Sequence, residues 1–157
     1  IYNAIFGKLD FDAQFSEELP FEHHVVLLGH GRVGRVIARV LSRANIPFVG
    51  VDINLAVVEE LKKKGTPFVY GDPSDLEVLD FAQVDKAKVV VIAVSDRNSQ
   101  EIIIRNALRL NPKVKIIVRS HFEKDKEFLL ASGAHVVVQP EREAGLTIAQ
   151  KILSQYP

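Results

Sequence analysis

The sequence predicts an α/β fold in which helices cover both faces of a parallel β-sheet. Short, continuously apolar runs such as Val89–Ile92 recur along the chain, and such runs indicate strands that are buried on both faces. Between them lie longer segments whose apolar residues repeat at helical spacing. Strands that alternate with helices are joined by right-handed crossovers, which make the strands parallel.

The pattern predicts six strands and six helices in alternation. We expect strands at His24–Leu28, Pro47–Asp52, Pro67–Gly71, Lys88–Ala93, Lys115–Arg119 and His135–Val138. We expect helices at Arg32–Ala44, Leu55–Lys64, Ser74–Phe81, Asp96–Leu110, Phe122–Ala131 and Arg142–Ser154, several of them ended by glycine or by Asn-Pro. Two successive βαβαβ halves predict a Rossmann-like, doubly wound sheet with the strand order 3-2-1-4-5-6.

The chain divides into an N-terminal arm and one domain. Residues 1–22 contain five acidic side chains and four phenylalanines, and we interpret them as an arm or linker. Residues 23–157 have the usual size of a single domain. The chain contains no methionine, even at its first position, which favours a domain taken from a longer chain.

Composition excludes several functions. The 20 basic and 20 acidic side chains balance, which argues against a nucleic-acid partner but permits a small anionic ligand. The absence of cysteine excludes disulfides, thiolate metal sites and a cysteine nucleophile. No apolar run approaches the roughly 20 residues that span a bilayer.

A glycine-rich turn follows the first predicted strand. Gly29, Gly31 and Gly34 have the spacing G-x-G-x-x-G, with a strand ending before them and a helix beginning within them. In such turns the first glycine allows a tight bend, the second lets the backbone approach a pyrophosphate, and the third lets the helix pack close to the strand. The dipole and the N–H groups at the helix start favour phosphate. The alternative is a tight turn that holds no ligand.

An acidic residue completes this pattern. Asp52 lies 18 residues after Gly34, at the end of the second strand. A carboxylate there accepts hydrogen bonds from ribose hydroxyls and repels a 2′-phosphate, which favours NAD-like or AMP-like ligands over NADP. The alternative for Asp52 is a helix N-cap, a role for which Asn54 is better placed.

Two side chains inside the turn are candidates for further contacts. The Arg32 guanidinium is suited to clamp a terminal phosphate through two hydrogen bonds; the alternative is a solvated arginine in the first helical turn. His30 is expected to be only a weak polar contact or a spacer.

Other candidates follow the third and fourth strands, at the carboxyl edge where open α/β sheets bind ligands. Gly71 and Asp72 end the third strand, and Asp72 or Asp75 either meets adenine or ribose or forms a turn and a helix cap. After the fourth strand, Ser95 is a candidate wall residue of the crevice and Asp96 a helix cap.

We predict no catalytic apparatus. Hydride transfer needs a substrate region and a proton donor beside the cofactor, and the chain beyond residue 140 is too short for a substrate domain. His23, His24 and His121 lack metal-ligand spacing, and Glu141 and Glu143 have no partner that would perturb them. We therefore expect no catalytic and no metal-binding residue, and nucleotide binding that serves sensing or coupling.

Several runs resemble the RCK N-lobe domain of potassium channels and transporters, also called TrkA-N or KTN. The resemblance covers roughly residues 23–155 and is carried by the runs 26–34, 51–54, 70–74, 91–96, 117–121 and 133–143. Within the last and most specific run, Pro140–Glu143 is most similar to the domain behind Kef-type monovalent cation:proton antiporters. Pro73 departs from the family, which more often has a small residue at that position.

The resemblance implies a regulatory domain that binds an adenine nucleotide and gates ion flux. AMP is the first expected ligand, with NAD(H), ATP or ADP as alternatives, and the implied site comprises Gly29, His30, Gly31, Arg32, Val33, Gly34, Asp52, Ile53, Gly71, Asp72 and Ser95. The implied partners are a second copy, forming a homodimer, and a membrane-embedded transport domain to which the arm would lead. The implied location is the cytoplasmic side of the membrane. Two other functions stay open: a fragment of an NAD-dependent oxidoreductase, and a dimerisation module with a vestigial nucleotide site.

Overall fold

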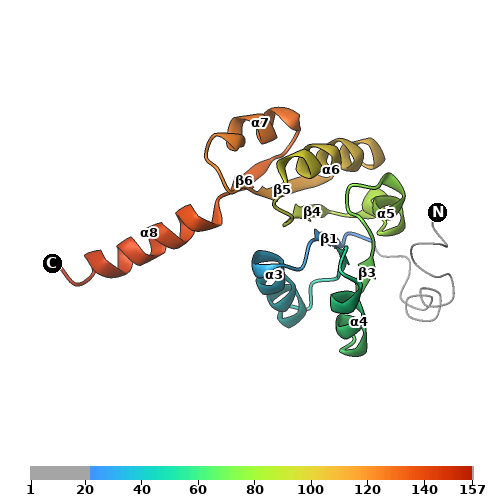
Figure 1. Cartoon of the computed structure of the whole chain (residues 1–157), viewed down its shortest axis with the longest axis horizontal. Helices are drawn as coiled ribbons and strands as arrows, with labels where there is room; N and C mark the ends of the chain where they lie inside the picture. The colour runs from blue at the N-terminus through green and yellow to red at the C-terminus, as the bar shows by residue number, and fades with distance from the viewer. Residues whose placement is uncertain (1–21, 157) are drawn as a thin grey trace.

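The computed structural model describes residues 22–156 of the chain. They form one all-parallel sheet in the order β3-β2-β1-β4-β5-β6, flanked by helices (Figure 1). The predicted fold class and strand order are confirmed. The predicted arm at residues 1–22 lies, apart from Glu22, outside the described residues.

Every predicted strand and helix is present, with ends that differ from the prediction by at most three residues. The strands are β1 (Val25–Leu28), β2 (Phe48–Asp52), β3 (Phe68–Tyr70), β4 (Val89–Ile92), β5 (Lys115–Arg119) and β6 (Val136–Val138). The helices are α3 (Arg32–Arg43), α4 (Leu55–Lys63), α5 (Leu76–Phe81), α6 (Arg97–Leu110), α7 (Asp125–Ser132) and α8 (Pro140–Leu153), with the 3-10 turn η1 (Val84–Lys86) between α5 and β4.

Two local differences from the prediction have simple causes. The turn η1 is not predicted; it follows Gln83, whose φ of +59° interrupts the helical backbone after α5. α7 begins later than predicted because the carbonyl oxygen of Phe122 accepts hydrogen bonds from the Ser120 hydroxyl and from the Asp125 N–H. These bonds close a turn before the helix starts.

The sheet separates two apolar cores. On one side, strand residues such as Leu28 and Ile92 pack against α5, α6 and α7. On the other side, Leu27 and Phe68 pack against α3 and α4. Neighbouring residues of β1 thus enter opposite cores, which is why the strand is continuously apolar. The carboxyl ends of β1 and β4 lie together at the centre of the sheet, where the strand order reverses and such sheets bind ligands.

α8 is an exception to this layered arrangement. It has no buried residue and extends away from the body of the fold (Figure 1). The other helices each bury at least one residue against the sheet or a neighbouring helix.

His24 makes the stability of the fold depend on pH. Its side chain is fully buried, and its Nε2 lies 3.0 Å from the carbonyl oxygen of Ala82. Burial lowers the pKa of His24 below the ordinary value of 6.5, against the opposing effects of that hydrogen bond and of the Asp85 charge. The unfolded chain therefore binds a proton at His24 more readily than the folded chain does. The contribution of neutral His24 to the free energy of unfolding is fully present above pH 6.5 and is lost as the pH falls toward the lowered pKa.

We expect urea unfolding to give a smaller free energy of unfolding at about pH 5.5 than at about pH 7.5. His24 alone contributes a slope of at most about 1.4 kcal/mol per pH unit in this range. His24→Gln removes the titrating group, so its slope should be smaller than that of the wild type. Equal slopes in the two proteins would assign the pH dependence to other groups.

Candidate nucleotide-binding site

The glycine turn connects β1 to α3 in a tightly packed bend. Gly29 has φ of +104°, a conformation that L side chains rarely adopt, and a Cβ there would lie 3.0 Å from Val94 Cγ1. A Cβ at Gly34 would overlap the carbonyl oxygen of Gly29. The predicted tight turn at Gly29 and close helix packing at Gly34 are therefore both present.

Gly31 has a different role, because it borders open space. It is the N-cap residue of α3, with an extended backbone and no side-chain hydrogen bond at the cap, and a Cβ there would meet no atom within 4 Å. The first N–H groups of a helix have no partner within the helix, and the helix dipole is positive at this end. The turn thus presents N–H donors to an accessible space, which is the arrangement that binds phosphate.

Asp52, at the end of β2, is hydrogen-bonded to the backbone of this turn. Its Oδ2 accepts a hydrogen bond of 2.7 Å from the His30 N–H, and its Oδ1 accepts one of 2.7 Å from the Asn54 N–H. The cap of α4 is Asn54, whose Oδ1 accepts a hydrogen bond from the Val57 N–H. The alternative role of Asp52 as a helix cap is therefore excluded. Its carboxylate lies beside the glycine turn.

The His30 side chain lies away from the mouth of the turn. Its ring packs edge-on against the Phe68 ring, with centroids 4.8 Å apart, in a groove of about 300 Å³ between α3 and α4. Burial lowers the pKa of His30, against the raising effect of Asp52. Its backbone N–H, which Asp52 holds, matters more to the turn than its ring does.

The acidic residues after β3 form local structure. Asp72 Oδ1 accepts hydrogen bonds from the Ser74 N–H and hydroxyl, which closes a turn after Gly71. Asp75 is the N-cap of α5 and accepts from the Glu77 N–H. Of the two predicted alternatives, contact with adenine or ribose and local structure, the structure shows the second: Asp72 forms a turn and Asp75 forms a helix cap.

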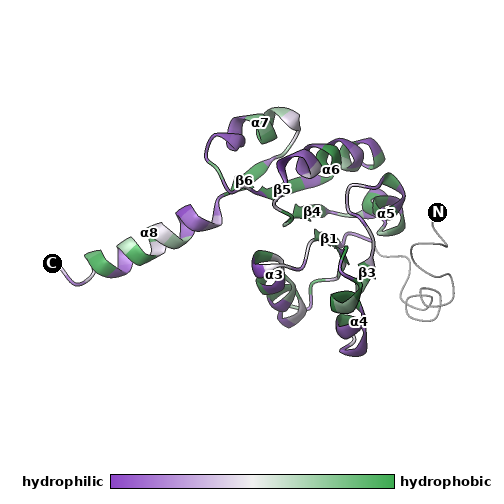
Figure 2. Cartoon of the chain, viewed as in Figure 1, coloured by the Kyte–Doolittle hydropathy of each residue, from purple (hydrophilic) through white to green (hydrophobic). Residues whose placement is uncertain are grey.

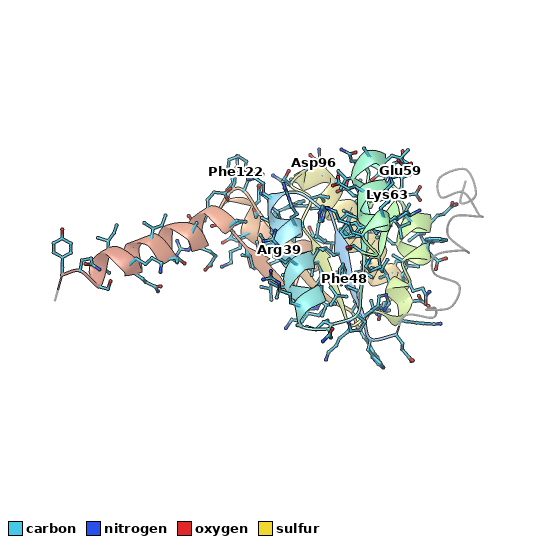
Figure 3. All side chains as sticks on the ribbon, turned by 90° about the horizontal axis from the view of Figure 1, so that it is seen from below. Arg39, Phe48, Glu59, Lys63, Asp96 and Phe122 are labelled. Atoms are coloured by element: carbon cyan, nitrogen blue, oxygen red, sulfur yellow. The ribbon has the colours of Figure 1, made fainter. Side chains whose placement is uncertain are left out.

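The loop after β4 lies next to the glycine turn, with Val94 close to Gly29. Asp96 is the N-cap of α6, as predicted, and accepts hydrogen bonds from the Ser99 N–H and hydroxyl. Both hydrogen bonds lower the pKa of the Asp96 carboxyl, and the one from the Ser99 hydroxyl has the larger effect. Ser95 is exposed at the same edge, and Figure 3 shows Asp96 and Phe122, from the next loop, on the same side of the molecule.

A second hollow, of about 240 Å³, lies between the start of α3 and the ends of β5 and α8. It is lined in part by Arg32 of the glycine turn, Arg119 at the end of β5, and Glu141 of α8. The buried Gln100 side chain donates hydrogen bonds to the carbonyl oxygens of Val94 and Arg119, at 2.8 and 2.7 Å, and so holds the loops after β4 and β5 together. Neither Gln100 nor Arg119 is predicted from the sequence as a site residue, although Arg119 ends a predicted strand at the edge of the sheet where ligands bind.

Two further observations concern residues 22–156. They contain no group of three or more acidic or histidine side chains placed to hold a metal ion. None of their helices combines the length and the hydropathy needed to cross a membrane. Ile53, next to Asp52, is 63% exposed.

The model of the TrkA-N domain family matches residues 25–140. The chain belongs to this family. Among curated relatives, it is 30% identical over 137 residues to the "Putative K(+) efflux antiporter KefB" of Alkalimonas amylolytica, covering 87% of this chain and 21% of that protein. It is 33% identical over 130 residues to the "Probable potassium channel protein 2" of Methanocaldococcus jannaschii, covering 81% of this chain and 38% of that protein. The chain thus spans well under half the length of either relative.

Two solved structures have the same fold. The TrkA-N domain of the inner membrane protein YbaL from Escherichia coli superposes with a TM-score of 0.78 at 28% identity, covering 88% of this chain and 100% of that one. The Kef C-terminal domain of Shewanella denitrificans, in an AMP-bound form, superposes with a TM-score of 0.73 at 21% identity, covering 84% of this chain and 80% of that one. The second comparison supports the fold alone.

Proposed function

We propose that this TrkA-N domain is the regulatory domain of a potassium or other monovalent cation transport protein, in which an adenine nucleotide bound at the glycine turn gates ion flux. The main support is the N-terminus of α3, which borders open space beside the Asp52 carboxylate. The N–H groups there can donate hydrogen bonds to a phosphate, and the carboxylate can accept hydrogen bonds from ribose hydroxyls. The site comprises the glycine turn 29–34, Asp52 and Ile53, with Gly71, Asp72 and Ser95 at its edge.

The relatives support the transport role. They are named as antiporters and channels, and this chain matches only a minor part of each. The partners in the proposal are a membrane-embedded transport domain and a second copy of this domain, on the cytoplasmic side of the membrane. The proposal assigns no catalysis to the domain. The carboxylates of Asp72, Asp75 and Asp96 accept hydrogen bonds from backbone N–H groups two or three residues further along the chain.

AMP is the ligand we propose first, with ADP, ATP and NAD(H) as alternatives. A single phosphate suits the start of α3, and the Asp52 carboxylate suits a ribose with free hydroxyls. Titration calorimetry with AMP, ADP, ATP, NAD and NADH tests the proposal. Saturable binding of at least one of them is expected, and no binding of any at millimolar concentration would overturn it in favour of a vestigial site.

Asp52→Asn is expected to weaken AMP binding about 10- to 100-fold, because hydrogen bonds to a charged group contribute about 1.5–3 kcal/mol. Asp52 also accepts from two backbone N–H groups, so the change perturbs the conformation of the turn as well. The analogue 2′,3′-dideoxy-AMP separates the two effects. In the wild type it should bind more weakly than AMP, and in Asp52→Asn the two should bind nearly alike. An unchanged ratio would show that Asp52 does not contact the ribose.

A further inference from the structure

Basic side chains gather at the amino edge of the sheet, where the helices end and the strands begin. The segments that lead from the last three residues of each helix to the first residue of the next strand contain nine basic side chains and two acidic ones, Asp80 and Asp85. Figure 2 shows hydrophilic residues, in purple, toward the lower ends of α3 and α4, which belong to this edge. We call the nine basic residues the basic edge: Arg43, Lys62, Lys63, Lys64, Lys86, Lys88, Arg109, Lys113 and Lys115.

The basic edge is exposed, and little of its charge is neutralised. All but one of the nine residues are exposed, and among the described residues Lys64 alone of the nine makes an ion pair, with Glu60 at 3.3 Å. The helix dipole favours a cation at a helix end, which accounts for the basic residues in the last turns of α3, α4 and α6. It does not account for Lys88, Lys113 and Lys115, which precede or begin strands. The surplus of positive charge therefore has another cause.

The N-terminal arm joins the domain in the middle of this edge. The His23 N–H donates a 2.9 Å hydrogen bond to the Lys86 carbonyl oxygen, and the Lys88 N–H donates one of 2.9 Å to the His24 carbonyl oxygen. β1, which follows His24, has β2 and β3 on one side and β4 and β5 on the other. Neighbouring strands lie about 4.8 Å apart, so β3 and β5 are each only about 10 Å from β1. The basic edge thus lies on both sides of the point at which the arm ends.

The arm has the opposite charge. Residues 1–22 contain a single basic side chain, Lys8, and five acidic ones: Asp10, Asp12, Glu17, Glu18 and Glu22. An extended chain spans up to about 3.3 Å per residue, so Glu17 and Glu18 can reach points about 15–20 Å from His23. That length covers the basic edge in either direction along the sheet.

We propose that the arm, through its acidic residues 10–22, binds the basic edge of its own chain. Each exposed ion pair contributes little, so the contact depends on several pairs at once and on the tether, which raises the local concentration of the arm. Phe15 and Phe21 flank the two glutamates in the sequence, and Ile46, between α3 and β2, is a 42% exposed apolar side chain that these rings can contact.

The proposed contact is sensitive to ionic strength, because salt screens exposed charges. The arm is held on the edge in dilute salt and released in concentrated salt. The contact goes beyond the proposed function, since it needs neither a bound nucleotide nor a second copy of the chain.

A spin label on the arm tests the contact. The chain has no cysteine of its own, so Ala13→Cys provides a single thiol for a nitroxide, which broadens the NMR signals of amides that it approaches. At about 0.1 M KCl we expect broadening of the Lys63, Lys88 and Lys113 amides, which lie on both sides of β1. At about 1 M KCl the screening length falls from about 10 Å to about 3 Å, and the broadening should be at least about twofold smaller.

Lys86→Glu/Lys88→Glu, in the labelled chain, reverses two charges beside the end of the arm. Both side chains are exposed, and the hydrogen bonds described for these residues use backbone groups, so the melting temperature should change little. The broadening at about 0.1 M KCl should fall at least about twofold, as it does in concentrated salt. Lys124→Glu/Lys126→Glu makes the same reversal at the opposite edge of the sheet and is the matched control; it should leave the broadening unchanged.

Glu17→Lys/Glu18→Lys alters the arm instead of the edge and should reduce the broadening to the same extent. Broadening that is equal at the two salt concentrations, or as strong in both glutamate-lysine reversals as in the unaltered labelled chain, would overturn the proposal. If the unaltered chain then binds phosphatidylglycerol vesicles, the basic edge belongs to an anionic membrane surface. Broadening of an unlabelled chain mixed with the labelled one would overturn binding within one chain in favour of a second copy. AMP calorimetry on the same samples reports separately on the nucleotide site.

Discussion

Gly31→Asp is expected to abolish AMP binding while the domain stays folded. A Cβ at this position would meet no atom within 4 Å, and the φ of −90° is open to any residue. The new carboxylate would occupy the space in front of the first N–H groups of α3 and repel a phosphate there. Calorimetry should show at least about 100-fold weaker binding, since a charge-assisted contact is replaced by repulsion. The melting temperature should be nearly that of the wild type.

The matched control for Gly31→Asp is Ser42→Asp, which adds the same charge near the other end of α3. It should bind AMP as the wild type does. If Gly31→Asp binds AMP at full affinity, the glycine turn is not the site, and the hollows beside His30 or Arg119 become the places to search.

Gly34→Ala, by contrast, is expected to destabilise the fold. The added Cβ would overlap the Gly29 carbonyl oxygen and lie 3.6 Å from Ala93 Cβ. Gly29 has little freedom to move away, because its N–H donates a 2.8 Å hydrogen bond to the Val51 carbonyl oxygen. Overpacking of this kind costs about 1–3 kcal/mol, and a clash with backbone atoms belongs at the upper end. Thermal unfolding followed by circular dichroism measures the loss.

Gly31→Ala provides the control for Gly34→Ala, because it adds the same methyl group three residues earlier in the turn. With open space around it, that change should alter the free energy of unfolding by no more than about 0.5 kcal/mol. Equal stability of the two alanine variants would contradict the account of close packing between α3 and β1. The pair therefore separates the glycine that shapes the fold from the glycine that faces the ligand.

The fold could be predicted because the sequence of each strand alone indicates that the strand is buried on both faces. Val89–Ile92 of β4 is continuously apolar since its residues face a core or a half-buried surface on either side of the sheet, and that pattern needs no knowledge of neighbours. The turn η1 escaped prediction because it depends on the left-handed backbone of Gln83, a residue that has no special preference for it.

The candidate site could be predicted only as far as its local geometry. The tight turn at Gly29 and the cap at Asn54 follow from sequence neighbours, and both are present. Gln100 and Arg119 act through contacts between segments far apart in the chain, and a polar residue within a helical pattern gives no indication of which carbonyls it will reach. The edge-on contact of His30 with Phe68 is of the same kind.

The exposed helix α8 shows a third limit of prediction. Its apolar residues predict a helix, and the helix is present. The pattern does not indicate that α8 has no buried residue and extends away from the body of the fold, with the single residue Gln139 between β6 and α8.

The most direct test of the central claim is an amide-resolved NMR titration of the domain with AMP. Binding at the glycine turn predicts that the largest shifts fall on the amides of residues 29–34 and 52–54, with the Gly31 and Arg32 amides among the first to move. Amides in the groove between α3 and α4, such as that of Leu61, should move little. Shifts confined to that groove, or no shifts at saturating AMP, would contradict the assignment of the turn as the nucleotide site.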